Sequence, residues 1–96
     1  RAIVNMYKIL PYSYFQANKL NVDILPSKKK GKKIDVFKDG IYQASIGDIN
    51  YFDYPTYAKK YGFKFANERR RLYRIRNFKT AQKKGTPAFY AFNILW

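Results

Sequence analysis

Histidine and cysteine are both absent from this chain of 96 residues, and only six residues are acidic. Without histidine there is no imidazole base, so Ser-His-Asp and Cys-His catalytic groups are excluded. Zinc sites, iron–sulfur clusters and disulfide scaffolds are excluded as well. Metal chemistry would need a carboxylate site for Mg²⁺ or Mn²⁺, for which the acidic side chains are few. We therefore expect a binding or structural protein, not an enzyme, with no cofactor and no metal.

Long apolar segments are also missing. The chain contains no apolar run of about 18 residues, so we expect no transmembrane helix and no membrane partner. The apolar stretch after Arg1 is too short and too interrupted to be a signal-peptide core. The length suits one domain, since domains most often have about 100 to 150 residues.

Positive charge and aromatic rings are abundant. Lysine and arginine number 20, which gives a formal net charge of +14 at pH 7. The 10 tyrosines and 8 phenylalanines are expected to supply much of the core. Uncompensated positive charge destabilises a compact state through self-repulsion, so the composition favours a polyanionic partner.

The first 26 residues are interpreted as an N-terminal extension with strand-like segments. Residues 2–10 are predicted to form a strand that Pro11 ends. Alternating apolar residues predict a second strand up to Pro26, over residues 20–26. The lysine-rich residues 27–33 follow, and because like charges repel at this density we expect a solvated, mobile loop.

Residues 27–96 are expected to form a basic α+β domain. Asp39-Gly40 between two β-rich segments predicts a hairpin of residues 33–38 and 41–46, since glycine accepts positive φ and aspartate tolerates it. The predicted fold is a single α+β domain, with an N-terminal β-hairpin or small antiparallel sheet followed by two or three short helices.

Proline and glycine mark the expected helices. Pro55 fits the first turn of a helix over residues 54–61, which Gly62 ends. A longer helix is predicted over residues 65–78. Thr86 as N-cap, followed by proline, predicts a last helix over residues 87–95.

The predicted helix 65–78 carries five arginines, which a turn of about 100° per residue distributes around its axis. If Leu72 faces the core, then Arg70, Arg71 and Arg74 form an outward face. Guanidinium groups stay charged and bind oxyanions bidentately, so this face suits phosphates. The lysines of the loop are expected to act as a flexible clamp: Lys28, Lys29, Lys30, Lys32 and Lys33.

Arg69 and Arg76 fall on the core-facing side of the same helix. A charge there must be paired or must reach solvent along its own stem. We interpret both as structural, bonded to carboxylates such as Asp48 or Asp53 or to backbone carbonyls, with a role in a ligand groove as the alternative. Glu68 is expected to cap the helix or to pair locally.

An aromatic cluster is open to two interpretations. Such side chains more often fill a core, but they also stack on bases. Its members are Tyr51, Phe52, Tyr54, Tyr57 and Tyr61. A helix-turn-helix pattern beginning at residues 57–63 fits poorly, because Glu68 and Arg71 occupy positions expected to be apolar.

Several short segments follow one another in a fairly specific order: residues 27–33, 47–48, 53–57, 68–71, 85–87, 89–91 and 95–96. In this order they resemble a family of small basic proteins of uncharacterised function, encoded by tailed phages and by large nucleocytoplasmic DNA viruses. Relatives often carry Arg-His where this chain has Arg76-Asn77. The resemblance implies a viral origin and association with the virion, and it supplies no catalytic residues.

These observations lead to one leading hypothesis and two alternatives. We expect a non-enzymatic protein of the virion or infected-host cytoplasm that binds nucleic acid through backbone phosphates, largely without sequence preference. The first alternative is a minor capsid or cement-type structural protein that binds acidic capsid surfaces, with Phe89, Phe92 and Trp96 as partner anchors. The second is an inhibitor that occupies the nucleic-acid groove of a host protein.

Overall fold

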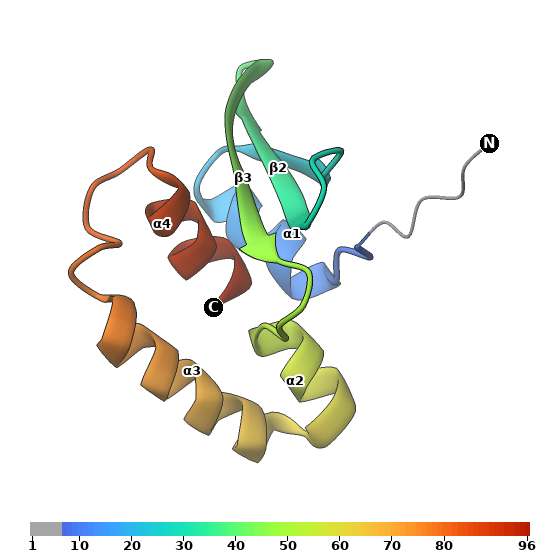
Figure 1. The fold of residues 1–96 in the computed structure, drawn as a ribbon, viewed down its shortest axis with the longest axis vertical. Helices are drawn as coiled ribbons and strands as arrows, with labels where there is room; N and C mark the ends of the chain where they lie inside the picture. Colours follow the sequence, from blue (N-terminus) through green and yellow to red (C-terminus); the bar gives the residue numbers. More distant parts are fainter. Residues whose placement is uncertain (1–6) are drawn as a thin grey trace.

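A three-stranded antiparallel sheet in the order β1-β2-β3 organises the chain (Figure 1). The computed structural model describes residues 7–96. The strands are β1 (Asp23–Pro26), β2 (Lys32–Lys38) and β3 (Ile41–Asp48). The helices are α1 (Pro11–Lys19), α2 (Tyr54–Tyr61), α3 (Phe63–Asn77) and α4 (Pro87–Tyr90), with α4 continuing into the π-helical turn η1 (Ala91–Leu95). The predicted α+β class is confirmed, although one helix precedes the strands.

The β2–β3 hairpin forms where it was predicted. Asp39 and Gly40 have φ values of 52° and 78°, the pair of positive values that a tight two-residue hairpin turn requires. The hairpin tip projects away from α2 and α3, which lie near the opposite end of the sheet (Figure 1). That opposite end, where β2 begins and β3 ends, also carries the lysine-rich residues 28–32.

The predicted strand over residues 2–10 is not observed. Its first part lies outside the described residues, and residues 7–10 have no regular secondary structure. Pro11 begins α1 instead of ending a strand, because a proline at the first helical position gives up no hydrogen bond. The second predicted strand is confirmed in the shorter range of β1.

Polar side chains of α1 bond to the end of the chain. The Ser13 hydroxyl donates to the Ile94 carbonyl at 3.0 Å, and the Gln16 amide donates to the Asn93 carbonyl at 3.0 Å. The last carbonyls of a helix have no partner within it, so these donors satisfy groups that η1 leaves open. The N-terminal helix is thereby joined to the C-terminal segment.

The core is mainly aliphatic and lies on one face of the sheet. The register places Ile24 opposite Val36 and Ile34 opposite Ile46, so their side chains share a face. Ile94 and other residues from α1 and the C-terminal segment complete the buried cluster. The expectation that aromatic residues supply much of the core is wrong for this cluster, whose buried members within residues 7–96 are aliphatic or small except for Tyr90; Tyr54 and Phe92 are buried outside it.

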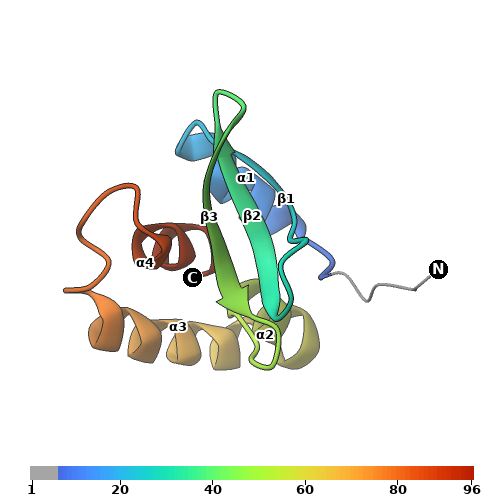
Figure 2. The same ribbon diagram turned by 45° about the horizontal axis from the view of Figure 1, so that its top comes forward.

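The helices after the sheet follow their predicted signals. The Asp53 side chain accepts the backbone N–H of Thr56 and caps α2, while Gly62 ends this helix with a φ of 91°. Thr86 caps α4 in the same way by accepting the N–H of Phe89. Figure 2 shows α3 lying across one end of the molecule, below the sheet and α4.

Candidate nucleic-acid interface

The orientation of α3 differs from the prediction. Its buried residue is Ala66, and Tyr73 and Asn77 on the same side are half-buried. Ile75, expected on the apolar side, has 65% of its surface exposed. The helix is thus rotated by about a quarter turn from the orientation that hydrophobicity suggests. This happens because its inner face consists of a small residue and of long side chains that cover aromatic rings.

Two of the three predicted phosphate-binding arginines pack on rings. The Arg70 guanidinium lies 4.0 Å from the centroid of Tyr54, and the Arg74 guanidinium lies 4.4 Å from that of Phe92. Both arginines are half-buried, and these distances are within the range of cation–π contacts. The predicted outward orientation is therefore wrong for Arg70 and Arg74.

Arg71 alone of the three has the predicted exposed position. It bonds to Glu68 on the same helix, with 2.7 Å between Nη2 and Oε2. The hydrogen bonds between these side chains lower the pKa of the Glu68 carboxyl, and the prediction that Glu68 pairs locally is confirmed. The pair is exposed, so it holds the guanidinium only weakly.

Arg69 and Arg76 were expected to bond to a carboxylate such as Asp48 or Asp53, but they bond to neither. Asp48 accepts the backbone N–H of Asn50 at 2.9 Å, and Asp53 is occupied by other partners. Both arginines are exposed and line a depression next to α3, the position that the ligand-groove alternative anticipates. The expected carboxylate pairing is wrong because a lysine from β2 takes Asp53.

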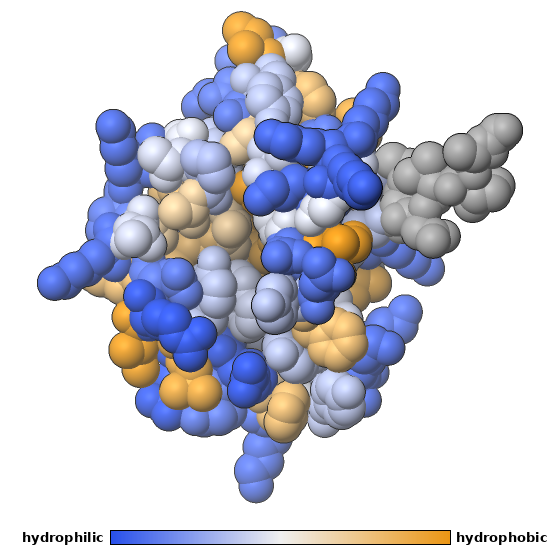
Figure 3. Space-filling model, viewed as in Figure 1, coloured by the Kyte–Doolittle hydropathy of each residue, from blue (hydrophilic) through white to orange (hydrophobic). Residues whose placement is uncertain are grey.

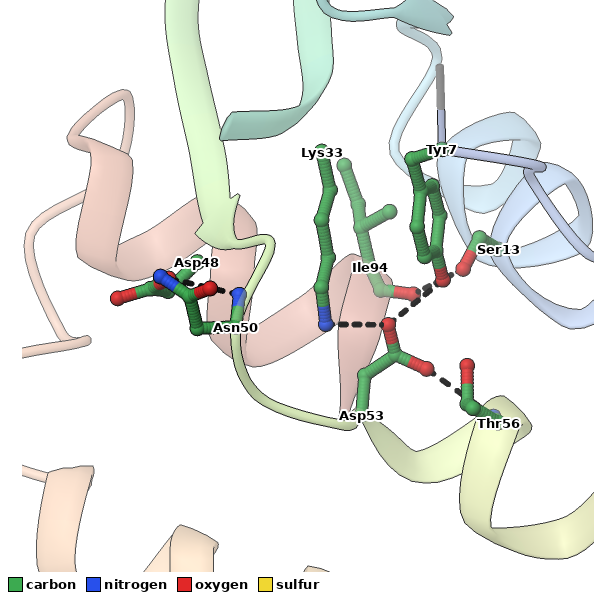
Figure 4. A network of polar contacts seen from close by, with 8 residues as sticks. All are labelled: Tyr7, Ser13, Lys33, Asp48, Asn50, Asp53, Thr56 and Ile94. Carbon is green, nitrogen blue, oxygen red and sulfur yellow. Dashed lines mark hydrogen bonds and ion pairs between the residues drawn. The ribbon is translucent and has the colours of Figure 1, made fainter. Parts of the chain in front are cut away.

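That lysine is Lys33, which was expected in the flexible clamp. Its Nζ lies 2.9 Å from Oδ2 of Asp53, and both side chains are buried (Figure 4). The Tyr7 hydroxyl donates to the same carboxylate oxygen at 2.6 Å. Burial and then the negative charge of Asp53 raise the pKa of Tyr7, which keeps this donor protonated. Asp53 is thus structural, as expected, and the assignment of Lys33 to a mobile clamp is wrong.

The remaining lysines of the loop are exposed, but the loop is anchored at its start. Asp35 accepts the hydroxyls of Ser27 and Ser45, each at 2.6 Å, and the backbone N–H of Lys28 at 3.2 Å. At the other end of the loop the Gly31 carbonyl accepts the N–H of Ile49 at 3.0 Å. The side chains of Lys28, Lys29, Lys30 and Lys32 therefore project from a fixed backbone.

Between this loop and α3 lie two adjoining depressions, which we call the aromatic groove. One, of about 180 Å³, borders α3, and the other, of about 310 Å³, reaches the start of β2. Four aromatic residues line both of them: Tyr51, Phe52, Tyr73 and Trp96. Arg69 and Arg76 line the first, while Lys32 and the carboxylate-bearing Asp48 line the second. In Figure 3, blue side chains flank paler residues on this face.

The rings of the groove differ in exposure. Tyr51 is 70% exposed and Phe52 is 40% exposed. Trp96 stacks on Tyr73, with ring centroids 4.2 Å apart and planes 7° from parallel. The groove thus combines a fixed aromatic pair with the accessible ring of Tyr51 and with the partly covered ring of Phe52, which packs on Tyr57 and has the Lys60 ammonium 5.5 Å from its centroid. Tyr54 is buried, so the aromatic cluster of the sequence divides between core and surface.

The predicted partner anchors are less accessible than expected. Phe92 is buried beneath Arg74, so it is not available to a partner. Phe89 and Trp96 are half-buried. Sequence reasoning missed the anchoring role of Asp35, for which the available signal was Ser45, its cross-strand partner in the predicted hairpin.

A larger depression of about 790 Å³ lies elsewhere, between α1 and the β1 edge. Its walls include the exposed rings of Tyr14 and Phe15 and the side chain of Leu25. The charged residue in its lining is Asp23, which would repel a polyanion. This apolar depression suits a protein partner better than a nucleic acid.

Comparison with family models, with curated proteins and with solved structures gives no match for this chain. Within the described part of the chain, no helix is long and apolar enough to cross a membrane. Among these same residues, no three carboxylates gather as a metal-binding group would.

Proposed function

We propose that this protein binds nucleic acid through its basic surface, largely without sequence preference. The distribution of charge carries this proposal. Over residues 7–96 every lysine and arginine is exposed except Lys33, Arg70 and Arg74, whereas Asp35 and Asp53 are buried. The surface is therefore less balanced in charge than the composition suggests, and such a surface attracts polyanions.

The phosphate contacts are assigned to two groups, each of which contributes residues to the lining of the aromatic groove, Lys32 from the first and Arg69 and Arg76 from the second. The first is the anchored lysine loop with Lys28, Lys29, Lys30 and Lys32. The second is the exposed set Arg69, Arg71 and Arg76 of α3, since Arg70 and Arg74 are half-buried against rings at 4.0 and 4.4 Å, whereas Arg69 lies 5.5 Å from the ring of Tyr57 and is exposed. Contacts to phosphates carry no sequence information, so affinity is expected to depend on salt more than on sequence.

Fluorescence anisotropy with labelled oligonucleotides at rising NaCl concentration tests this function. We expect the logarithm of the association constant to fall linearly with the logarithm of salt concentration, by about 0.7 to 0.9 per phosphate neutralised. The triple variant Lys28→Gln/Lys29→Gln/Lys30→Gln should bind more weakly and lower the slope by about one for each phosphate that is no longer neutralised.

A matched control removes three charges from another region. Lys79→Gln/Lys83→Gln/Lys84→Gln changes the net charge equally, in exposed residues that belong to neither of the two groups assigned to phosphate contacts. This control should keep the slope of the wild type. Equal losses of affinity in both variants would point to net charge alone, and affinity unaffected by salt would refute the proposal.

The capsid or cement-type alternative is supported by a separate observation, the apolar depression between α1 and the β1 edge. Exposed apolar surface of this kind is typical of protein contacts. Because resemblance suggests a virion setting, cross-linking in purified particles distinguishes the two: links to nucleic acid favour our proposal, and links confined to shell protein favour the alternative. Phe15→Ser should weaken only the second kind of contact.

A further inference from the structure

We propose that the aromatic groove binds unpaired nucleotides, with bases stacked on Tyr51 and Phe52 and phosphates held by Lys32, Arg69 and Arg76. This inference rests on the proposed function and names the form of nucleic acid that the groove accepts. We expect the groove to bind a single strand of DNA or RNA more tightly than a duplex.

The groove offers the two kinds of group that bind a nucleotide, aromatic rings and cations. Aromatic rings with cations at their edges are the arrangement by which proteins hold single strands, because every base has a π face and every nucleotide has a phosphate. Here exposed rings lie between cations from two elements, Lys32 on β2 and the arginines of α3. The exposed cations Lys32, Arg69 and Arg76 outnumber the one exposed side-chain carboxylate of the lining within residues 7–96, Asp48, so the net charge favours a polyanion, and the rings favour one with planar groups.

The ring of Tyr51 is accessible to a base. Tyr51 takes part in none of the ring–ring contacts among the described residues, and it is the most exposed of the large hydrophobic side chains there. Such a ring contributes little to stability where it stands. A partner that covers it gains contact area without disturbing the core.

The size of the groove suits a single planar ring better than a base pair. Its larger depression, of about 310 Å³, is at the lower end of the range for small-ligand sites, about 300 to 1,000 Å³. A volume of this size is enough for one or two planar rings. Bases within a duplex are stacked on each other, so their faces are not available to Tyr51 or Phe52.

The fixed pair of Trp96 and Tyr73 supplies a signal for the test. The chain has one tryptophan, so its emission reports on this groove alone. A base that enters beside Trp96 should quench the emission. Contact of phosphates with the outer surface should leave it nearly unchanged.

The experiment compares three oligonucleotides of about 12 nucleotides, within the usual site size for single strands. They are a thymidine strand, the same strand with abasic sites throughout, and a duplex. We expect the thymidine strand to bind about a hundredfold more tightly than the abasic strand, the effect of two base–aromatic stacks of about tenfold each. Only the thymidine strand should quench Trp96, and a uridine strand of equal length tests RNA in the same way.

Two variants locate the effect. Tyr51→Ala, and Phe52→Leu, which keeps apolar volume but removes the ring, should each lose about tenfold in affinity for the thymidine strand at an unchanged salt slope. Both should bind the abasic strand like the wild type. Tyr14→Ala removes a ring of α1 that is 50% exposed, between the values of Phe52 and Tyr51, and lies outside the groove; this variant should bind all strands normally.

The outcomes separate the two proposals. Equal affinity for thymidine and abasic strands, with unchanged emission, would overturn base stacking and leave phosphate binding intact. Tighter binding of the duplex than of the thymidine strand would also overturn it. Failure of every strand to bind at low salt would refute the proposed function together with this inference.

Discussion

The buried ion pair between Lys33 and Asp53 is the residue-scale feature most sensitive to substitution. Lys33→Met leaves the carboxylate without its cation inside the fold, with 1% of the side chain exposed. We expect the free energy of unfolding to fall by about 3 to 5 kcal/mol in urea denaturation. Asp53→Asn should also destabilise, because it removes the charge that the Lys33 ammonium faces.

The neighbouring residue supplies the control for this prediction. Lys32→Met alters an exposed side chain on the same strand and should change stability by no more than about 0.5 kcal/mol. The double variant Lys33→Met/Asp53→Asn should lose less than the sum of its single variants, since neither partner is left charged and alone. Strict additivity would contradict a direct interaction.

Asp35 makes stability depend on pH at the acid end. Burial raises the pKa of its carboxyl, but hydrogen bonds from Ser27, Ser45 and the backbone N–H of Lys28 outweigh this effect and lower the pKa overall. The carboxylate therefore stabilises the fold above about pH 4, and this contribution is lost as the pH falls through the lowered pKa. In urea denaturation at several pH values, the free energy of unfolding of Asp35→Asn should fall less steeply below about pH 4 than that of the wild type. A slope equal to that of the wild type would disprove the assignment.

At the scale of elements, Gly47 permits β3 to pass close to the C-terminal segment. A Cβ atom there would lie 2.8 Å from Cδ1 of Leu95 and 2.9 Å from Cδ of Lys33, both in buried residues. Gly47→Ala should therefore suffer overpacking of about 1 to 3 kcal/mol in addition to the strain of its positive φ. Thermal unfolding would measure this loss of stability.

Gly31 is the matched control, because its φ of 82° is almost the same and no atom lies within 4 Å of the added Cβ. Gly31→Ala should lose only the conformational part, about 1 to 2 kcal/mol. Equal destabilisation at both positions would show that packing against Leu95 contributes nothing.

Elements marked by local signals were predictable, and elements defined by tertiary contacts were not. The Asp39-Gly40 turn, the proline-initiated helix α2 and its end at Gly62 depend on backbone preferences that neighbouring residues fix. Helix α1 was missed because its inner face holds only the small residues Ser13 and Ala17, while its rings gave it the composition of a strand.

The candidate site was only partly predictable for the same reason. A helical wheel assumes that apolar residues face inward, and α3 turns Arg70 and Arg74 inward because rings of Tyr54 and Phe92 receive their guanidinium groups. The position of Arg69 and Arg76, which line a depression and do not bond to a carboxylate, therefore could not be deduced without the tertiary structure. The positive charge of residues 28–32 was visible in the sequence, whereas its position beside the aromatic groove follows from the hairpin.

At the scale of the whole molecule, self-repulsion of the net charge of +14 should limit stability at low salt. Raising NaCl from about 0.01 M to about 1 M shortens the screening length from about 30 Å to about 3 Å, so we expect Tm to rise. Differential scanning calorimetry measures this shift. The Lys28→Gln/Lys29→Gln/Lys30→Gln variant carries less charge and should show a smaller rise, and a Tm that falls with salt would contradict the prediction.

The burial of Lys33 has a practical consequence for mapping any partner. Acylating reagents modify amino groups that are exposed to solvent. Lys33 is only 4% exposed and should be shielded, whereas Lys28, Lys29, Lys30 and Lys32 are exposed and should react. In one tryptic or chymotryptic peptide map, the reactivity of Lys33 would report global opening of the chain, and that of its neighbours would report coverage by a ligand. Residues 28–33 thus provide both the lysines that report ligand binding and, in Lys33, an internal reference for unfolding.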